Sequence, residues 1–266
     1  MSKPAFRQLT VHSTHTITPN MQRVVFTGEA LNDFPLSQES AYIKLMFDAE
    51  GQPLTAMPEE NNKTEKPRLR SYTIRDYNPQ DQLLTVDFVL HGHGDDQGPA
   101  GRWAQVTAPG DIIMIKGPGP KKLVDNSADW FLLVGDMTAL SAICCNLEQL
   151  PADARGYAII EVADARDKQS IQTPEGMELI WLVNADLNPQ TSLLSNTVKE
   201  LEWLTGSPAV WSACEFSNMR QLRAYFKTER NVERERLYIS SYWKKGFSDE
   251  QHKVAKRKDA EAFGAL

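Results

Sequence analysis

The chain contains a continuous apolar run, Trp130-Phe131-Leu132-Leu133-Val134, that ends at Gly135. A run of this kind is typical of a strand that is buried on both faces of a parallel sheet. A helical pattern follows over residues 138–150, and a second apolar run covers residues 157–162. Strand, helix and strand in this order predict a βαβ unit.

The same alternation continues towards the C-terminus. Further strands are predicted at residues 179–183, 209–213 and 236–241, followed by helical patterns at residues 193–204, 218–229 and 249–262. The second half of the chain is therefore predicted to be a doubly wound α/β domain with a mostly parallel sheet and a C-terminal helix. Ligands of such sheets bind outside the carboxyl ends of the strands.

The first half of the chain has a different pattern. Short runs rich in β-branched and aromatic residues, separated by turn residues, occupy residues 40–47, 69–75, 84–91 and 111–116. In the third run the apolar residues Leu84, Val86, Phe88 and Leu90 recur at every second position. This period of two predicts an antiparallel sheet or barrel with one face packed inward.

The length of 266 residues fits two domains, and we place their boundary between residues 124 and 125, near Pro118, Pro120 and Asn126. With 41% apolar and 24% charged residues, the composition is that of a globular protein. The net charge of −6 argues against non-specific binding to nucleic acid or to an anionic membrane surface. Residues 219–266 carry 12 basic and 7 acidic side chains, which fits a solvated amphipathic helix or a positive face for a small anionic ligand.

The sequence also bears on location. No apolar run approaches the roughly 20 residues of a membrane-spanning helix, so we expect no membrane insertion. The first residues lack the apolar core of a secretory signal. Cys144, Cys145 and Cys214 make an odd count in a large chain, which predicts reduced, buried thiols and a cytoplasmic protein.

Two segments of the first half carry possible ligand chemistry. On the strand Arg70-Ser71-Tyr72-Thr73-Ile74-Arg75, the side chains of Arg70 and Tyr72 point to the same face. An aromatic ring beside a guanidinium suits a flavin nucleotide, although an ordinary half-exposed strand has the same residues. Residues 87–104 form the end of a strand, a glycine-rich turn and the start of a short helix, where a pyrophosphate can bind.

These motifs occur together with Ala108-Pro109-Gly110-Asp111, with residues 134–143, and with Ser240-Ser241-Tyr242-Trp243-Lys244-Lys245-Gly246. In this combination the chain resembles the siderophore-interacting protein family, which are FAD-dependent ferric-siderophore reductases of the ferredoxin–NADP reductase superfamily. The likeness covers nearly the whole chain. It implies a flavin-binding antiparallel β-barrel over residues 1–124 and an NAD(P)H-binding-like α/β domain with a C-terminal helix over residues 125–266.

The resemblance also implies the residues that bind FAD. The first group would hold the isoalloxazine and the adjacent phosphate, and consists of Arg70, Ser71, Tyr72 and Thr73. Backbone groups around Asp87 and Val89 would reach the flavin as well. The second group would shape the pyrophosphate and adenosine end, and consists of His91, Gly98, Ala100, Gly101 and Trp103. No catalytic side chain is expected, because the flavin carries the chemistry.

The electron donor is left open between NADH, NADPH and a ferredoxin. By resemblance, the nucleotide would lie near Asp136, Thr138, Glu215 and Arg220. The turn after residue 135 lacks the G-x-G-x-x-G pattern, and Asp136 adds a negative charge where a phosphate would approach. Glu215 and Arg220 equally fit a helix-start carboxylate and a surface charge.

For the ferric siderophore, the resemblance implies a pocket lined by basic side chains. Lys44, Lys121 and Lys245 are our candidates, and Lys122 and Lys244 are adjacent alternatives. Their charge would favour anionic catecholate and carboxylate chelates. Lysines that merely lie along the surface are the competing interpretation.

Other chemistries find less support in the sequence. His91 and His93, followed by Asp95 and Asp96, have the spacing of metal ligands, but no other His or Cys lies nearby, and we predict no metal site. The G-x-S-x-G motif of α/β hydrolases is absent.

We therefore predict an FAD-dependent ferric-chelate oxidoreductase that reduces an Fe(III)-siderophore to Fe(II) and releases the iron. The alternatives are a general flavin or ferredoxin reductase, and a module that binds ferric siderophore without turnover.

Overall fold

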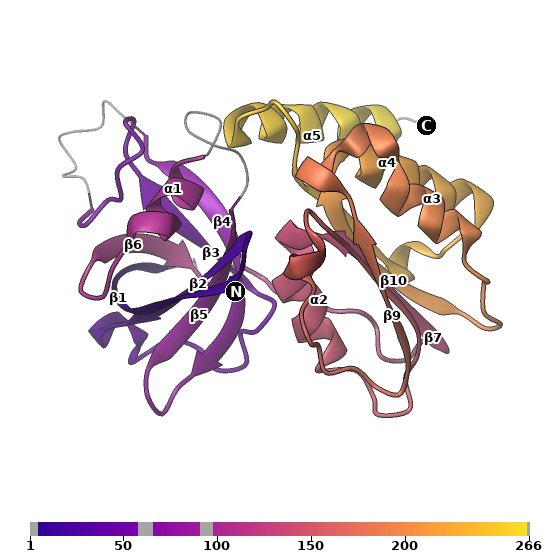
Figure 1. Cartoon of the computed structure of the whole chain (residues 1–266), viewed down its shortest axis with the longest axis horizontal. Coiled ribbons are helices and arrows are strands. Elements are labelled where there is room, and N and C mark those ends of the chain that lie inside the picture. Colours follow the sequence, from indigo (N-terminus) through magenta and orange to yellow (C-terminus); the bar gives the residue numbers. More distant parts are fainter. Residues whose placement is uncertain (1–4, 58–65, 91–97, 265–266) are drawn as a thin grey trace. The chain divides into compact units, whose positions relative to one another are not determined.

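The computed structural model describes residues 5–57, 66–90 and 98–264. The chain divides into two compact units, Met1–Lys122 and Leu123–Leu266 (Figure 1). The domain boundary predicted from the sequence, between residues 124 and 125, lies two residues beyond this division. Each unit has its own sheet and its own buried core.

The first unit is a closed barrel of six antiparallel strands in the order β1-β2-β5-β4-β3-β6. The strands are β1 (Ala5–Thr18), β2 (Met21–Thr27), β3 (Tyr42–Phe47), β4 (Arg68–Asn78), β5 (Leu83–Val89) and β6 (Ile112–Gly117). The antiparallel barrel is as predicted, and β3 to β6 match the four predicted strands. Strands β1 and β2 were not predicted, and in β1 a bulge between Val11 and Ser13 breaks the alternation.

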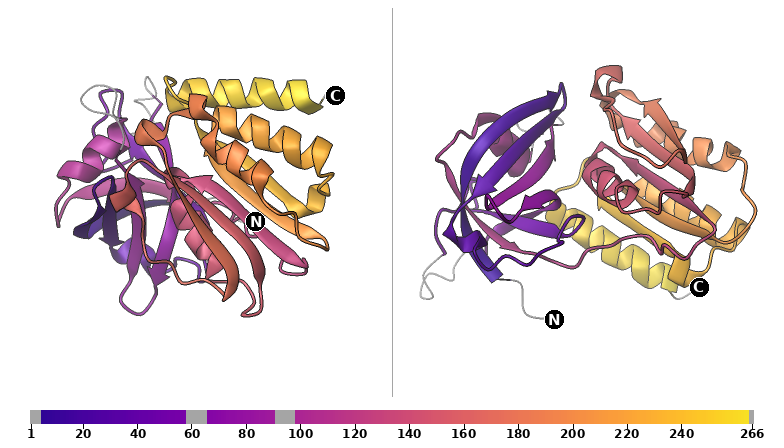
Figure 2. Two further views of the ribbon diagram at one scale, coloured as in Figure 1. Left: turned by 45° about the vertical axis from the view of Figure 1, so that its right-hand side comes forward. Right: turned by 90° about the horizontal axis from the view of Figure 1, so that it is seen from below.

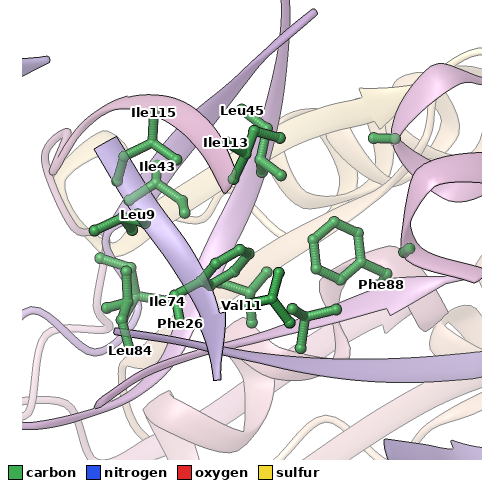
Figure 3. Close-up of a cluster of buried hydrophobic side chains, with 14 of the residues drawn as sticks. Leu9, Val11, Phe26, Ile43, Leu45, Ile74, Leu84, Phe88, Ile113 and Ile115 are labelled. Carbon is green, nitrogen blue, oxygen red and sulfur yellow. The ribbon is translucent and has the colours of Figure 1, made fainter. Parts of the chain in front are cut away.

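Apolar side chains fill the inside of the barrel. Figure 3 shows this cluster, in which Leu9, Phe26, Ile43, Leu45 and Ile115 are completely buried. Helix α1 (Pro99–Val106) adds the ring of Trp103 to the same core. Because the interior is filled, a ligand of this unit has to bind at an end of the barrel or outside it.

The second unit is built on a five-stranded parallel sheet in the order β11-β10-β7-β8-β9. The strands are β7 (Trp130–Asp136), β8 (Arg155–Val162), β9 (Gly176–Val183), β10 (Pro208–Glu215) and β11 (Leu237–Trp243). The order reverses between β7 and β10, so the carboxyl ends of these two strands form the topological switch point at which α/β sheets bind ligands.

Helices cover both faces of this sheet, as predicted for a doubly wound fold. Helix α2 (Leu140–Leu147) lies on one face, and α3 (Leu193–Glu200) and α4 (Phe216–Ala224) lie on the other (Figures 1 and 2). Helix α5 (Asp249–Gly264) lies beside α4, and an ion pair between Arg223 and Asp259 links the two helices. Both faces of β7 are buried, in agreement with its apolar run.

Several helices differ in length from the prediction. The helix predicted at residues 193–204 ends at Glu200, because Leu201 is extended and the chain turns to pack Trp203 against Trp130. Helix α4 starts at Phe216 and continues as a π-helical turn, η7 (Tyr225–Glu229). Short 3-10 helices are η1 (Glu29–Leu31), η3 (Met137–Ala139), η4 (Ala165–Asp167), η5 (Ala185–Leu187), η6 (Pro189–Thr191) and η8 (Arg234–Arg236).

One glycine is required by packing. At Gly135, an added Cβ would lie 2.7 Å from the Cβ of Ala139 and 2.7 Å from the carbonyl oxygen of Ala213. The glycine at the end of β7 therefore allows the first turn after the strand to pack directly against the sheet. Within the described ranges, no helix combines the length and the apolar character needed to cross a membrane.

Candidate functional site

Strand β4 presents the predicted aromatic and cationic pair on one face. Tyr72 is paired with Ile43 of β3, and Arg70 is paired with Leu45. Tyr72 is half-buried, and its ring packs on Phe88 of β5 with a centroid distance of 4.3 Å. Arg70, also half-buried, donates a hydrogen bond from Nη1 to the carbonyl of Leu69. A ring supported from behind, with a guanidinium two residues away, can hold a flat ligand that carries phosphate.

Trp103 supports this pair from inside the barrel. Its ring is 6% exposed and lies 5.8 Å from Phe88 and 6.0 Å from Phe26, measured between ring centroids. Phe88 in turn contacts Tyr72. In this structure Trp103 therefore fixes the aromatic stack behind Tyr72.

Helix α1 supplies a possible anion site. Gly98 is its N-cap and Pro99 opens the first turn. In the part of the chain that the structure describes, the backbone N–H groups of Ala100 and Gly101 have no hydrogen-bond partner, and no described atom lies within 4 Å of a Cβ added at Gly98. Ala100 and Gly101 are themselves buried, and the exposed N-cap Gly98 is the point at which a pyrophosphate can approach this helix end.

The other residues predicted to bind FAD have different surroundings. Ser71 and Thr73 lie on the opposite face of β4 from Tyr72, paired with Lys44 and Tyr42. The carboxylate of Asp87 accepts hydrogen bonds of 2.7 and 2.9 Å from Arg23, so its side chain is already engaged. Val89 is 9% exposed. His91 and the His-Asp cluster at residues 91–96 lie outside the described residues.

In the second unit, Asp136 occupies the switch point but is turned inward. Its side chain is 1% exposed. Oδ1 accepts hydrogen bonds from the backbone N–H and hydroxyl of Thr138, and Oδ2 accepts from the Glu215 N–H and from Nε1 of Trp243, both at 2.8 Å. Burial raises the pKa of Asp136, while these hydrogen bonds act in the opposite direction. The carboxylate thus connects the ends of β7, β10 and β11.

Glu215 is buried in the same way at the end of β10, with 2% exposure. Its Oε2 accepts the backbone N–H of Ser217 and caps helix α4. Its Oε1 accepts the backbone N–H of Lys245 at 3.3 Å. Both oxygens therefore bind the chain itself.

A third carboxyl group at this edge was missed by the sequence analysis. Glu161 of β8 pairs with Asp136 of β7 and is 2% exposed. The Asn184 side chain and the Leu194 N–H donate to it, yet its Oε2 has no partner within the described ranges. Burial is the main cause that raises the pKa of Glu161 to about 7, and the charges of Asp136 and Glu215 add to it. The available signal was an acidic residue inside the apolar run of residues 158–162.

Comparison with known proteins decides the family. Residues 10–122 match the model of the siderophore-interacting FAD-binding domain, and residues 128–246 match that of the siderophore-interacting protein. The ferric vibriobactin reductase ViuB of Vibrio cholerae is 33% identical over 243 residues, which cover 89% of this chain and 88% of that protein. The chain belongs to the siderophore-interacting protein family. The family predicted from the motifs is thereby confirmed.

Two further relatives of this siderophore-interacting protein agree. The crystal structure of SipS from Aeromonas hydrophila superposes with a TM-score of 0.84 at 31% identity, and covers 97% of this chain and 99% of that one. The NADPH-dependent ferric-chelate reductase of Escherichia coli is 28% identical over 248 residues, covering 90% of this chain and 92% of that enzyme. The barrel of the siderophore-interacting protein is compatible with FAD, since the described residues include the half-buried ring of Tyr72, the cation of Arg70 and the exposed N-cap Gly98 of α1.

The three candidate lysines of this siderophore-interacting protein differ in how they are held. Lys44 is half-buried, with its Nζ 5.6 Å from the centre of the Tyr42 ring. Lys121 is exposed and donates to the carbonyl of Ser37 at 2.9 Å. Lys245 is exposed, and its ammonium has no partner among the residues that the structure describes. Of the candidate nucleotide residues, Thr138 is half-exposed, and Arg220 is 62% exposed and pairs with Asp259 at 3.1 Å.

Proposed function

We propose that this protein is an FAD-dependent ferric-siderophore reductase that releases iron as Fe(II). The observation that carries the proposal is the Tyr72 ring, packed on Phe88 beside Arg70, within the segment that matches the siderophore-interacting FAD-binding domain. The named relatives, a ferric vibriobactin reductase and a ferric-chelate reductase, support the same reaction.

Each barrel residue then has a defined task. Tyr72 binds the isoalloxazine and, with Phe88 behind it, excludes water from one side of the ring. Arg70 and the first-turn N–H groups of Ala100 and Gly101 bind the phosphates. Bound there, FAD would supply the two-electron chemistry toward the donor and the one-electron chemistry toward Fe(III). Iron as Fe(II) is held less tightly by hard oxygen ligands, and it leaves the chelate.

The substrate contacts are assigned to Lys44, Lys121 and Lys245. Each ammonium attracts an anionic ferric chelate, and within the described residues Lys44 and Lys245, unlike Lys121, donate no hydrogen bond to the main chain through Nζ. We expect Lys44→Ala to raise KM for an anionic chelate roughly fivefold at low salt, equivalent to about 1 kcal/mol for a partly exposed charge pair. An equal effect on a neutral chelate would remove the electrostatic argument.

The donor is NADPH, NADH or a ferredoxin, and the Escherichia coli relative supports NADPH as the first candidate. Thr138 and Arg220 are exposed enough to meet a nucleotide, which would compete with the hydrogen bond of Thr138 to Asp136 and the ion pair of Arg220 with Asp259. Asp136 and Glu215 are buried, with their oxygens engaged by the chain. We place the reaction in the cytoplasm, supported by three buried cysteines that form no disulfide, Cys144, Cys145 and Cys214.

An anaerobic absorbance experiment tests the function. The FAD-loaded protein is reduced with NADPH, NADH or reduced ferredoxin in parallel and then mixed with a ferric catecholate in the presence of a ferrous trap. Flavin bands that bleach with one donor and return as trapped Fe(II) forms establish the reductase and its donor. Failure to bind FAD after reconstitution, or reoxidation without Fe(II), contradicts the proposal.

A further inference from the structure

The segment that follows β11 is held by two buried carboxylates from other strands. Trp243 ends β11, and Lys244, Lys245 and Phe247 form the turn before α5. The partners are Asp136 at the end of β7 and Glu215 at the end of β10.

The first connection is a side-chain hydrogen bond. Nε1 of Trp243 donates to Oδ2 of Asp136 at 2.8 Å. Asp136 is 1% exposed, and its position is fixed by three further donors on Thr138 and Glu215. A hydrogen bond from an N–H group to a buried carboxylate is among the stronger ones in proteins, so the indole is anchored at the switch point.

The second connection reaches the main chain. Oε1 of Glu215 accepts the backbone N–H of Lys245 at 3.3 Å, while its Oε2 is fixed by Ser217 at the start of α4. The backbone of Lys245 is therefore tied to the end of the neighbouring strand by a side chain that is itself 2% exposed.

The ammonium groups of the two lysines in the turn have different surroundings. The Nζ of Lys244 lies 4.6 Å from the centre of the Phe216 ring and 3.9 Å from that of Phe247, so its charge is held against aromatic faces. Lys245 is exposed, and no residue in the described ranges pairs with its ammonium. A fixed backbone thus carries a free cation.

We propose that Asp136, Glu215 and Trp243 are positioning residues that hold Lys245 in place to bind an anionic ferric chelate. The inference rests on the proposed function, because it assigns these residues to the substrate contact of Lys245. Fixing the backbone lowers the conformational entropy that is lost on binding, which strengthens binding without adding a contact. The carboxyl groups act through Lys245 and touch no substrate themselves.

A mutant cycle tests the proposal on the FAD-loaded full chain. Trp243→Phe removes the N–H donor and keeps an aromatic ring, and Trp181→Phe on β9 is the matched control. KM and kcat are measured for an anionic ferric tris-catecholate and a neutral ferric tris-hydroxamate. We expect Lys245→Ala to raise KM for the anionic chelate roughly tenfold and Trp243→Phe at least roughly threefold, with no change for the neutral chelate. The double variant should equal Lys245→Ala, because Trp243 acts only through Lys245.

Two further variants keep the test decisive. Glu215→Gln weakens the second connection and should raise the same KM, which covers the case that Trp243→Phe does not fold. Lys245→Arg keeps the charge and should restore most of the binding.

If Lys245→Ala raises KM but Trp243→Phe and Glu215→Gln do not, the positioning role is wrong and the reductase function stands. The same holds if the effects of Trp243→Phe and Glu215→Gln add fully to that of Lys245→Ala. If Lys245→Ala has no effect, the substrate contact of Lys245 fails and the positioning role falls with it. If the unsubstituted protein does not reduce the neutral chelate, the reductase function itself is contradicted.

Discussion

The carboxyl group of Glu161 gives the second unit a stability that falls as the pH rises. The side chain is 2% exposed at the carboxyl end of β8, opposite Asp136 and close enough to Glu215 for both charges to act on it. Burial favours its neutral form and raises the pKa of Glu161 from 4.5 to about 7. A carboxyl group whose pKa is raised by folding stabilises the folded protein at pH values below its pKa in the unfolded chain. This contribution is lost as the pH rises through its pKa in the folded protein.

The size of this contribution to the unfolding free energy follows from the pKa shift of Glu161. A change from 4.5 to about 7 corresponds to about 3 kcal/mol of unfolding free energy, which is present near pH 4.5 and lost by about pH 8. Glu161→Gln keeps the shape and stays neutral at every pH. The variant should match the unsubstituted protein near pH 5 and be more stable by about 3 kcal/mol near pH 8.

Urea unfolding followed by tryptophan fluorescence is the suitable assay. Five of the six tryptophans lie in the second unit, at positions 130, 181, 203, 211 and 243, so the signal reports mainly on that unit. The difference between the two proteins cancels the titration of other groups that both share. Glu178→Gln, which removes an exposed carboxylate from the adjacent strand β9, is the control and should give a pH-independent difference. A constant difference between Glu161→Gln and the unsubstituted protein from pH 5 to 8 would refute the reasoning.

Three other variants test separate parts of the structure. Arg70→Ala should lower the FAD content of the purified protein without shifting the unfolding midpoint of the flavin-free protein, and unchanged flavin absorbance would count against the phosphate contact. Gly135→Ala should destabilise the second unit by roughly 1–3 kcal/mol in urea, because the new Cβ would lie 2.7 Å from two neighbouring atoms. His252, bonded to Ser241 at 2.9 Å, has a pKa lowered mainly by burial, and Lys256, Lys244 and Lys253 act in the same direction against Asp249. The pKa of His252 is lower in the folded protein than in the unfolded chain, so the protein loses stability as the pH falls below 6.5. His252→Gln should make this loss smaller. An unchanged dependence of the unfolding free energy on pH below 6.5 would contradict the role of His252.

The strand and helix pattern was readable wherever one periodicity covered a whole element. The apolar run of β7 and the alternation of β5 each follow from how many faces of the strand are buried. Strand β1 was not predicted, because no single periodicity covers it. Its bulge shifts the inward positions after Val11, and threonine and histidine surround them. A local pattern cannot reveal a strand whose alternation changes phase within it.

The barrel site was predictable in part for the same reason. Arg70 and Tyr72 are two residues apart on one strand, so strand geometry alone places them on one face. The support of Tyr72 by Phe88 and Trp103 depends on pairings between distant segments, and the sequence gives no local signal for it. The same geometry turns Ser71 and Thr73 to the other face of β4, beside Lys44 and Tyr42, and their contact with FAD stays a prediction.

At the carboxyl edge of the second unit, the sequence predicts which residues lie close together but not the hydrogen bonds that they make. Parallel strands bring the ends of β7, β10 and β11 to one edge, so the proximity of Asp136, Glu215 and Trp243 follows from the predicted topology. From sequence, Asp136 is expected to place a negative charge where a phosphate would approach. In the structure its two oxygens accept four hydrogen bonds from the chain, one of them from a tryptophan 107 residues away. Because these oxygens point at internal donors and the side chain is 1% exposed, Asp136 does not face an incoming phosphate directly, and the absence of G-x-G-x-x-G is the remaining sequence observation on how a nucleotide donor would bind.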